Sequence, residues 1–383
     1  MIQTLSTRTI CCKVSLDSAA DTALRETQQA FNRAASYCAS VAWEQGVTNK
    51  NKLHHLVYAR TRVEFGLGAQ LACCARDKAA EAVRRARQDK KADCPTFRDD
   101  SSIRYDARTY RLMSLDRVSL NTLTGRVIGQ LVLGDFQRRT LYDQTWKIGG
   151  AELVRRANVW YLHITQTKTD PAPDEPVGVI GVDLGLVNLA TDSDGEQYSG
   201  AQVRAIRERR FQHRQRLQKT NTRRARWRLR QLAGKEARFQ RQVNHEISKR
   251  LVNKAKQQRK ALALEDLKGI RERVTVRRSE RRQRASWAFH QLRLFVSYKA
   301  QRAGVRVVLV DPRNTSRTCS ACGHCEKDNR KTQDRFLCVA CGYQANADVN
   351  AAVNISRAAV NQPIVSAPHV GAGYKLPALA GSC

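Results

Sequence analysis

Four cysteines near the C-terminal end of the chain are spaced for binding a metal ion. They form two CxxC pairs with fifteen residues between the pairs: Cys319, Cys322, Cys338 and Cys341. Each pair offers two thiolates from one tight turn, and four thiolates are the ligand set of a closed, structural Zn²⁺ site. The spacing therefore predicts structural zinc rather than a redox pair or a catalytic metal. We expect the neighbouring Cys325 and His324 not to be ligands, with a substituted ligand set as the alternative.

Three acidic residues stand in apolar surroundings, where an unpaired carboxylate is unfavourable. Asp183 lies in the strand-like segment VIGVDLG, Glu265 in LALEDL, and Asp348 opens the helical segment ADVNAAVNI. Each has a structural explanation when taken alone: a turn cap for Asp183, an arginine partner for Glu265 and a helix N-cap for Asp348. Taken together, two adjacent strands and a helix start can bring the three carboxylates to one place.

Three converging carboxylates in a basic protein predict a site for Mg²⁺ or Mn²⁺, which prefer oxygen ligands. Two such ions about 3.5–4 Å apart activate water and stabilise the leaving oxygen when a phosphodiester bond is cleaved. The basic helices of the chain would supply the contacts to phosphate.

The charge balance of the chain indicates a polyanionic partner. The 383 residues include 68 Lys and Arg against 35 Asp and Glu, a formal net charge of +33. Residues 204–284 are the most basic part, with 29 Lys and Arg against 7 Asp and Glu. Such an excess lacks the opposite charges of an ordinary solvated helix face. A nucleic-acid backbone fits this charge best, and an anionic membrane surface is the alternative.

Other sequence features favour a location inside the cell. No run of about 18 apolar residues predicts a membrane span, and the N-terminus lacks the charged and apolar regions of a signal peptide. Five of the 12 cysteines cluster between residues 319 and 341, which fits a metal site in a reducing compartment better than a disulfide framework. We therefore expect no membrane partner and a location inside the cell; the family resemblance described below implies the cytoplasm of a prokaryotic cell, at the nucleoid.

The pattern along the chain predicts two parts joined by the Pro- and acid-rich segment 169–178. Residues 1–15 alternate like a strand, and residues 18–48 and about 69–91 have a helical pattern. Residues 101 to about 168 contain short strands with turn signals, typical of a small barrel or sandwich.

From residue 177 onward, strand and helix patterns alternate. A strand meander over 177–196 is followed by long basic helices, a buried strand over 261–267, a helix over 286–304 and a strand over 305–312. This order predicts an α/β domain with a mixed sheet. We expect the tail 358–383 to be disordered. The aromatic residues of the basic helices and of the helix after them are expected in the core rather than as base-stacking platforms: Trp227, Phe239 and Trp287.

Five segments resemble the motifs of a known family, in the family's order. They are GVDLG (181–185), LEDL (264–267), DPRNTSRTCSACG (311–323), FLCVACGY (336–343) and ADVNAAVNI (347–355). The set is similar to the three RuvC motifs and the embedded zinc ribbon of the transposon-encoded TnpB proteins, and of the type V CRISPR effectors related to them. The similarity is strong over 177–357 and weak over 95–112, which resembles the segment entering the family's β-barrel.

The resemblance implies an α/β RNase H-like (RuvC) core with an embedded zinc ribbon, plus an N-terminal β-barrel (wedge) domain carrying a helical recognition insertion. The implied boundaries are 1–16 and 95–170 for the wedge domain, 17–94 for the insertion, 177–314 and 344–357 for the nuclease domain, and 315–343 for the zinc ribbon.

The function that the resemblance implies is that of an RNA-guided DNA endonuclease. Such a protein binds a guide RNA, recognises target DNA next to a short motif and cleaves phosphodiester bonds. By motif position, Asp183, Glu265 and Asp348 are the catalytic carboxylates that hold Mg²⁺ or Mn²⁺, and the four cysteines hold Zn²⁺. Asn346-Ala347 precedes Asp348 where many TnpB proteins have Asp-Arg, so a CRISPR effector and a transposon protein both stay open. The number of copies on one RNA stays open too.

Two other functions fit parts of the pattern. A non-catalytic zinc-ribbon protein that binds RNA or DNA would keep the basic surface and use the three acids structurally. A DDE-type transposase would also have an RNase H-like core, but the order Asp, Glu, Asp with the cysteine pairs just before the last Asp speaks against it. Because all three acids are present, we favour the nuclease.

Overall fold

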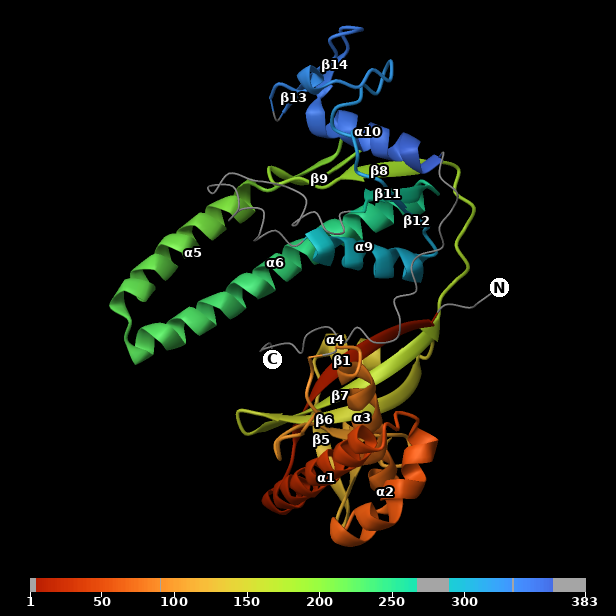
Figure 1. Cartoon of the computed structure of the whole chain (residues 1–383), viewed down its shortest axis with the longest axis vertical. Coiled ribbons are helices and arrows are strands. Elements are labelled where there is room, and N and C mark those ends of the chain that lie inside the picture. Colours follow the sequence, from red (N-terminus) through yellow and green to blue (C-terminus); the bar gives the residue numbers. More distant parts are fainter. Residues whose placement is uncertain (1–4, 90, 267–288, 333, 361–383) are drawn as a thin grey trace. The chain divides into compact units, whose positions relative to one another are not determined.

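The computed structural model describes residues 5–89, 91–266, 289–332 and 334–360 (Figure 1). The described chain forms two compact units, one over Leu5–Thr169 and one from Asp170 onward. The boundary falls at the start of the segment predicted as a linker. Within the described ranges, no helix combines the length and the apolar composition needed to cross a bilayer.

The first unit is built on one seven-stranded antiparallel sheet. Its strands are β1 (Leu5–Ser15), β2 (Ile103–Tyr105), β3 (Tyr110–Leu112), β4 (Arg117–Thr122), β5 (Gly125–Val132), β6 (Lys147–Arg156) and β7 (Val159–Thr169). Their order is β2-β6-β7-β1-β5-β4-β3. A side chain links β3, at one end of this order, to β6, next to the other end, since the Tyr110 hydroxyl donates to the carbonyl oxygen of Gly149 at 2.6 Å.

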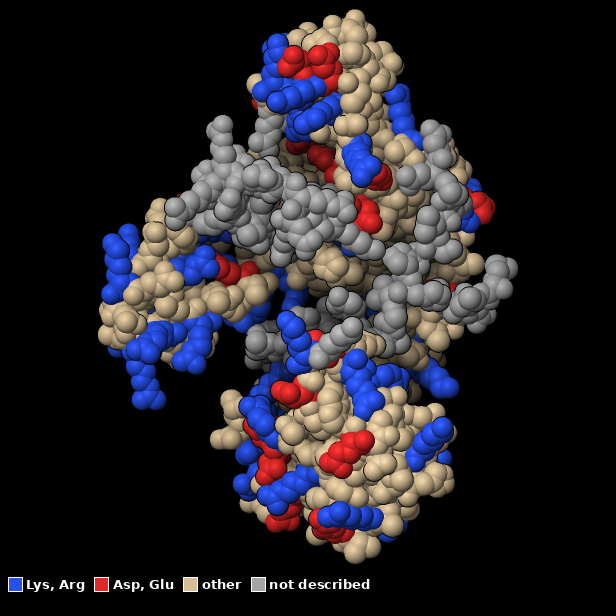
Figure 2. Space-filling model, in the orientation of Figure 1, with Lys and Arg blue, Asp and Glu red and all other residues tan. Residues whose placement is uncertain are grey.

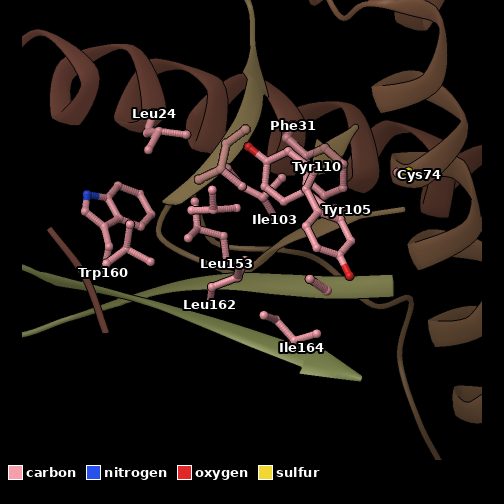
Figure 3. Close-up of a cluster of buried hydrophobic side chains, with 14 of the residues drawn as sticks. Leu24, Phe31, Cys74, Ile103, Tyr105, Tyr110, Leu153, Trp160, Leu162 and Ile164 are labelled. Atoms are coloured by element: carbon pink, nitrogen blue, oxygen red, sulfur yellow. The ribbon is translucent and has the colours of Figure 1, made fainter. Parts of the chain in front are cut away.

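Helices pack on this sheet, which confirms the helical character predicted before residue 94. α1 (Ser18–Glu44) and α3 (Ala69–Ala86) contact the sheet, α2 (Lys50–Glu64) packs on these two helices, and a short α4 (Asp135–Leu141) follows β5. α1 begins where the Asp17 carboxylate accepts a hydrogen bond from the backbone N–H of Ala20 at 2.7 Å. Figure 3 shows the core between helix and sheet, where Leu24 and Phe31 of α1 pack with Trp160 and Leu162 of β7.

The second unit contains a five-stranded mixed sheet, as the alternating pattern predicted. Its strands are β8 (Val179–Asp183), β9 (Asn188–Asp192), β10 (Gln197–Ser199), β11 (Ala261–Glu265) and β12 (Val307–Val310), in the order β10-β9-β8-β11-β12. The meander β8-β9-β10 is antiparallel, whereas β8, β11 and β12 run parallel. The remaining strands, β13 (Arg335–Leu337) and β14 (Gln344–Asn346), form a separate ribbon.

Helices lie on both faces of the five-stranded sheet (Figure 1). Alternate residues of a strand point to opposite faces. On one face α6 (Arg223–Gln257) and α9 (Phe289–Ala303) pack on Ile180, Val182, Leu262 and Leu264. On the other face α10 (Ala347–Val360) packs on Ala263, Val308 and Val310. A further helix, α5 (Ala201–Thr220), runs back along α6 as a helical hairpin.

Two expectations from the sequence are corrected by these elements. α10 continues to Val360, so residues 358–360 are helical and do not belong to a disordered tail; residues 361–383 lie outside the described residues. Trp227 was expected in the core, but its side chain is 56% exposed because it faces away from α5. Phe239 does pack against the core of the second unit, and Trp287 lies outside the described residues.

Gly181 allows an unusually close approach between β8 and α10. A Cβ atom at this position would lie 2.0 Å from the carbonyl oxygen of Ala352 and 2.5 Å from the backbone nitrogen of Ser356. The Ser356 hydroxyl donates to the carbonyl oxygen of Val179 at 2.8 Å, which ties the helix to the strand. The strand and the helix therefore meet backbone to backbone at residue 181.

We predict that Gly181→Ala lowers the free energy of unfolding by about 3 kcal/mol, because backbone atoms of α10 must move to admit the methyl group. Denaturant-induced unfolding measures this change. Gly178→Ala is the matched control, since its Cβ would meet only the Lys260 side chain, at 3.7 Å or more. Equal stability of the two variants would contradict the close contact.

Candidate functional site

Asp183 and Glu265 end two neighbouring parallel strands of the second unit. Leu264 on β11 pairs with Val182 on β8, so the two acids occupy the next position of the same register. Alternation along the strands turns both acids toward the face that α10 covers, because Val182 and Leu264 pack on the opposite face. The strand ladder therefore sets these two carboxylates side by side, as the sequence predicted.

Asp348 comes to the same face from the first turn of α10. It is not the N-cap, which was its structural explanation in the sequence. The Asn346 side chain is the cap and accepts hydrogen bonds from the backbone N–H of Asp348 at 3.0 Å and of Val349 at 3.2 Å. The carboxylate of Asp348, which is 8% exposed, is thereby left to other partners.

Polar side chains from three further elements hold the acids in place. Thr315, after β12, donates to Oε1 of Glu265 at 2.5 Å. Asn188 on β9 donates to Oδ2 of Asp348, and Arg330 donates to Oδ1 of the same carboxylate, both at 3.1 Å. Each oxygen of Asp348 thus has its own donor, which fixes the plane of the carboxylate.

Asp183 and Glu265 both have raised pKa values. Burial, together with the negative charges of Glu265 and Asp348, raises the pKa of Asp183 to about 7, and the Arg330 guanidinium opposes this rise. Burial also raises the pKa of Glu265, against the hydrogen bond from Thr315 and the charge of Arg330. Crowded carboxylates of this kind favour the binding of a cation, which relieves their mutual repulsion.

Arg330 is a site residue that the sequence did not single out. It follows the short helix η1 (Lys327–Asn329). The preceding Asn329 is fully buried and donates to the carbonyl oxygens of Arg317 at 2.9 Å and His324 at 3.1 Å. The side-chain oxygen of Asn329 accepts a hydrogen bond from the backbone N–H of Val339 at 2.9 Å. The only sequence signal for Arg330 was its place between the cysteine pairs. A single arginine is not distinctive in a chain with 68 Lys and Arg residues.

The four cysteines of the two CxxC pairs converge. Their sulfur atoms all lie within 4.8 Å of one another, with Cys319 and Cys341 at 3.8 Å and Cys322 and Cys338 at 3.6 Å. Within the described ranges this is the one set of three or more His, Cys, Asp or Glu residues that is gathered so tightly; the three carboxylates are more widely spread. Cys325 and His324 lie outside the set, as expected. Backbone N–H groups of Cys341 and Ala340 stabilise the thiolate of Cys338 and lower its pKa to about 6.

Asparagines of α10 connect the cysteine pairs to the carboxylates. Asn350 accepts the backbone N–H of Ser320 at 2.9 Å and donates to the carbonyl oxygen of Thr318 at 2.9 Å. One turn later, Asn354 donates to the carbonyl oxygens of Thr315 and Thr318 at 2.9 and 2.6 Å. These bonds therefore fasten residues 315–320 to α10, the helix that carries Asp348. The fastened segment includes Thr315, which bonds Glu265, and leads into the first CxxC pair.

We predict that Asp183→Asn stabilises the protein at high pH. The pKa of Asp183 is raised from 3.8 to about 7 on folding, so its contribution to the free energy of unfolding falls as pH rises between these values. Without added divalent cations, the variant should be about 1–2 kcal/mol more stable than the wild type at pH 8, less than the full shift gives because the side chain keeps some contact with water. At pH 5 the difference should be less than half as large. Denaturant unfolding at both pH values tests this, and an equal difference at both would contradict the raised pKa.

Two sequence families match this chain. The family described as Cas12f1-like, TNB domain matches residues 289–355, and the family described as probable transposase, OrfB_IS605, matches residues 163–270. These ranges contain Glu265, Asp348, Arg330 and all four cysteines of the converging set.

Named relatives and a solved structure agree with these families. The CRISPR-associated endodeoxyribonuclease Cas12f1 of Sulfoacidibacillus thermotolerans is 31% identical over 258 residues, 60% of this chain and 59% of that protein. The TnpB-like protein MJ0751 of Methanocaldococcus jannaschii is 26% identical over 257 residues, 63% of this chain and 90% of that protein. The match thus spans less than two thirds of the Cas12f1 relative.

The fold is shared with a protein chain in the cryo-EM structure of the Cas12f1-sgRNA-target DNA complex. That chain is 17% identical, with a TM-score of 0.67, and the match covers 89% of this chain and 83% of that chain. The resemblance to TnpB and to compact type V effectors is therefore confirmed: the chain matches an IS605-type probable-transposase model and a Cas12f1-like TNB model, and it shares its fold with the Cas12f1 chain.

Proposed function

We propose that this protein is an RNA-guided DNA endonuclease that binds a guide RNA and cleaves target DNA next to a short motif. The observation that carries the proposal is the meeting of Asp183, Glu265 and Asp348 from two parallel strands and a helix on one face of the sheet. The net charge of +33 supplies sequence-independent attraction to nucleic-acid phosphates. The names of the relatives support it, since Cas12f1 is named an endodeoxyribonuclease and the matching structure is titled as a complex with sgRNA and target DNA.

We assign the parts of the fold on the same basis. The mixed sheet with its flanking helices corresponds to an RNase H-like (RuvC) core over 177–314 and 344–357, with 315–343 as a zinc ribbon. The seven-stranded sheet corresponds to a wedge barrel over 1–16 and 95–170, and the link between Tyr110 and Gly149 supports closure of that sheet. Residues 17–94 are then the recognition insertion.

The three carboxylates fit Mg²⁺ or Mn²⁺. They are hard oxygen donors, and their mutual repulsion is what a divalent cation relieves. When bound, such an ion would supply the Lewis acid that activates water and offsets the charge of the phosphate under attack.

The chain's own residues give this site its shape. Thr315 orients Glu265, while Asn188 and Arg330 orient Asp348 from opposite oxygens. Arg330 also brings a fixed positive charge to the place where a phosphate would approach, so it both positions a carboxylate and attracts the substrate.

The four cysteines fit structural Zn²⁺. Zinc–sulfur bonds of about 2.3 Å in a tetrahedron put the sulfur atoms about 3.8 Å apart. The sulfur atoms of Cys319 and Cys341 are 3.8 Å apart, those of Cys322 and Cys338 are 3.6 Å apart, and all four lie within 4.8 Å of one another. Four thiolates leave no open coordination position, so we assign this ion to stability alone.

We predict that Asp183→Ala lowers cleavage of guided target DNA by more than about 100-fold, because even substitutions behind a metal's direct ligands cost 10–100-fold. Binding of the guide RNA should be unchanged. The protein is expressed with its native flanking DNA, the copurifying RNA is sequenced, and a plasmid matching its variable end is the substrate, with Mg²⁺ or Mn²⁺.

The matched control is Asp266→Asn, since Asp266 adjoins Glu265 but pairs with Arg293 at 2.6 Å; this variant should still cut. Cutting by Asp183→Ala would refute the site. Binding of RNA and target by the wild type without cutting in either metal would replace the nuclease by a non-catalytic binding protein. An RNA that matches DNA beside a mobile element indicates a transposon protein, and one that matches spacers indicates a CRISPR effector.

We also predict that Cys338→Ser removes the bound zinc and lowers the thermal stability, because three remaining thiolates bind the ion more weakly. Elemental analysis of the purified protein should find about one zinc per chain in the wild type and much less in the variant. Cys325→Ser, in the same ribbon but outside the converging set, should keep its zinc. Loss of zinc from both variants would mean a different ligand set.

A further inference from the structure

The turn end of the α5–α6 hairpin concentrates positive charge. Between Arg209 and Lys235 the sequence contains 11 Lys and Arg and no Asp or Glu. Figure 2 shows basic side chains around this end of the hairpin, at the lower left of the upper unit. Arg214 pairs with Glu236 of the same hairpin. Because no acid lies within the stretch itself, most of its charge is left for a partner from outside the hairpin.

One face of α6 in this stretch packs against α5. Ala225 is buried, and Leu229 and Leu232 are half-buried. The same helical stripe continues to Glu236, which bonds Arg214 of α5 at 3.0 Å. Residues 225, 229, 232 and 236 repeat at the spacing of one helix face, so this is the face that α5 covers.

Trp227 lies on the opposite side of the helix from this seam. Two positions after Ala225 correspond to a rotation of about 200° around a helix axis. Its indole is accordingly 56% exposed, although tryptophan is among the side chains most often found highly buried or at interfaces.

Arginines surround this indole on its own face. Arg223, Arg224 and Arg230 lie four before, three before and three after Trp227, positions that are neighbours on a helix surface. All three are exposed, and within the described part of the chain none of them pairs with an acid. We name the four residues the Trp227 surface: Arg223, Arg224, Trp227 and Arg230.

We propose that the Trp227 surface binds single-stranded nucleic acid, with the indole stacked on an unpaired base and the arginines on the phosphates beside it. An aromatic face set among positive charges is the arrangement that holds single strands without reading sequence. The arginines alone could bind the phosphates of a duplex. The indole could not stack there, because the base faces of a duplex are covered by the neighbouring base pairs. The inference rests on the proposed function and deepens it by assigning one place to an unpaired strand, whether of RNA or of DNA.

The test compares oligonucleotides that differ only in their bases. Binding of the full-length protein to labelled dT₁₂, rU₁₂ and an abasic 12-mer is measured by fluorescence anisotropy without divalent cations, so that nothing is cut. Trp227→Ala should reduce the preference for dT₁₂ or rU₁₂ over the abasic strand about tenfold, within the range known for one stacked base. Trp227→Phe should retain most of the preference. Arg223→Gln with Arg224→Gln should weaken binding of all three strands alike and lower the salt dependence, by about 0.7 per lost phosphate contact.

Two controls separate base stacking at Trp227 from nonspecific aromatic contact and from a loss of folding. Phe136 on α4 is another exposed aromatic residue, 68% exposed and close in sequence to Arg138 and Arg139; Phe136→Ala should leave the preference unchanged. Thermal unfolding of Trp227→Ala should match the wild type, because the indole is exposed.

Three outcomes would overturn the proposal. Equal loss of binding to dT₁₂ and the abasic strand would exclude stacking. An equal effect of Trp227→Ala on a 12-bp duplex would make the occupant a duplex. A lowered melting temperature with an unchanged preference would mean that the indole packs on protein. Since no cleavage is measured, a chain that never cuts DNA can still pass this test, and a guided nuclease can fail it.

Discussion

The contact of α10 with β8 leaves no space for a side chain at residue 181, and the geometry of the candidate site depends on it. Asp183 and Glu265 are fixed relative to each other by the backbone ladder of β8 and β11. Asp348 has no such ladder, because it comes from a helix laid across the strands. Its distance from the other two acids is set by how closely α10 can approach, which Gly181 decides. The absence of a side chain at Gly181 therefore determines how close the carboxylate of Asp348 comes to the other two.

Two groups of side chains with opposite chemical character lie beside the same helix. Soft thiolates gather at the ribbon, and hard carboxylates gather at the first turn of α10 and the strand ends, so under the proposed function the two groups would suit different classes of metal. The asparagines at 350 and 354 keep the two sets at a constant separation through the segment between Thr315 and Ser320. The hydrogen bonds of Asn329 fix the backbone next to Arg330, whose guanidinium reaches from the ribbon to the carboxylate of Asp348. The ribbon thus contributes geometry to the site as well as stability.

The sequence predicted those parts of the site that follow from local pattern. An acid at the end of an apolar strand is unusual by itself, so Asp183 and Glu265 stood out, and matched spacing identified the four cysteines. The structural alternative for Asp348, a helix N-cap, is not realised, because Asn346 takes that role; both are good capping residues, and only the backbone conformation selects between them. Arg330 was missed because its role comes from the bonding of the buried Asn329, which no periodicity records. Trp227 was expected in the core because aromatic side chains are most often buried, yet it lies on the side of α6 opposite Ala225, Leu229 and Leu232.

The order of the elements along the chain has a consequence for protein synthesis. β8, the basic hairpin and β11 are all complete by residue 265, whereas Asp348 belongs to α10, the last element that the structure describes. A ribosome therefore releases the surfaces that attract nucleic acid well before the carboxylate that completes the proposed nuclease site. If the protein acts as proposed, a nascent chain presents its basic surfaces before it holds all three carboxylates, so binding of RNA can precede the ability to cut.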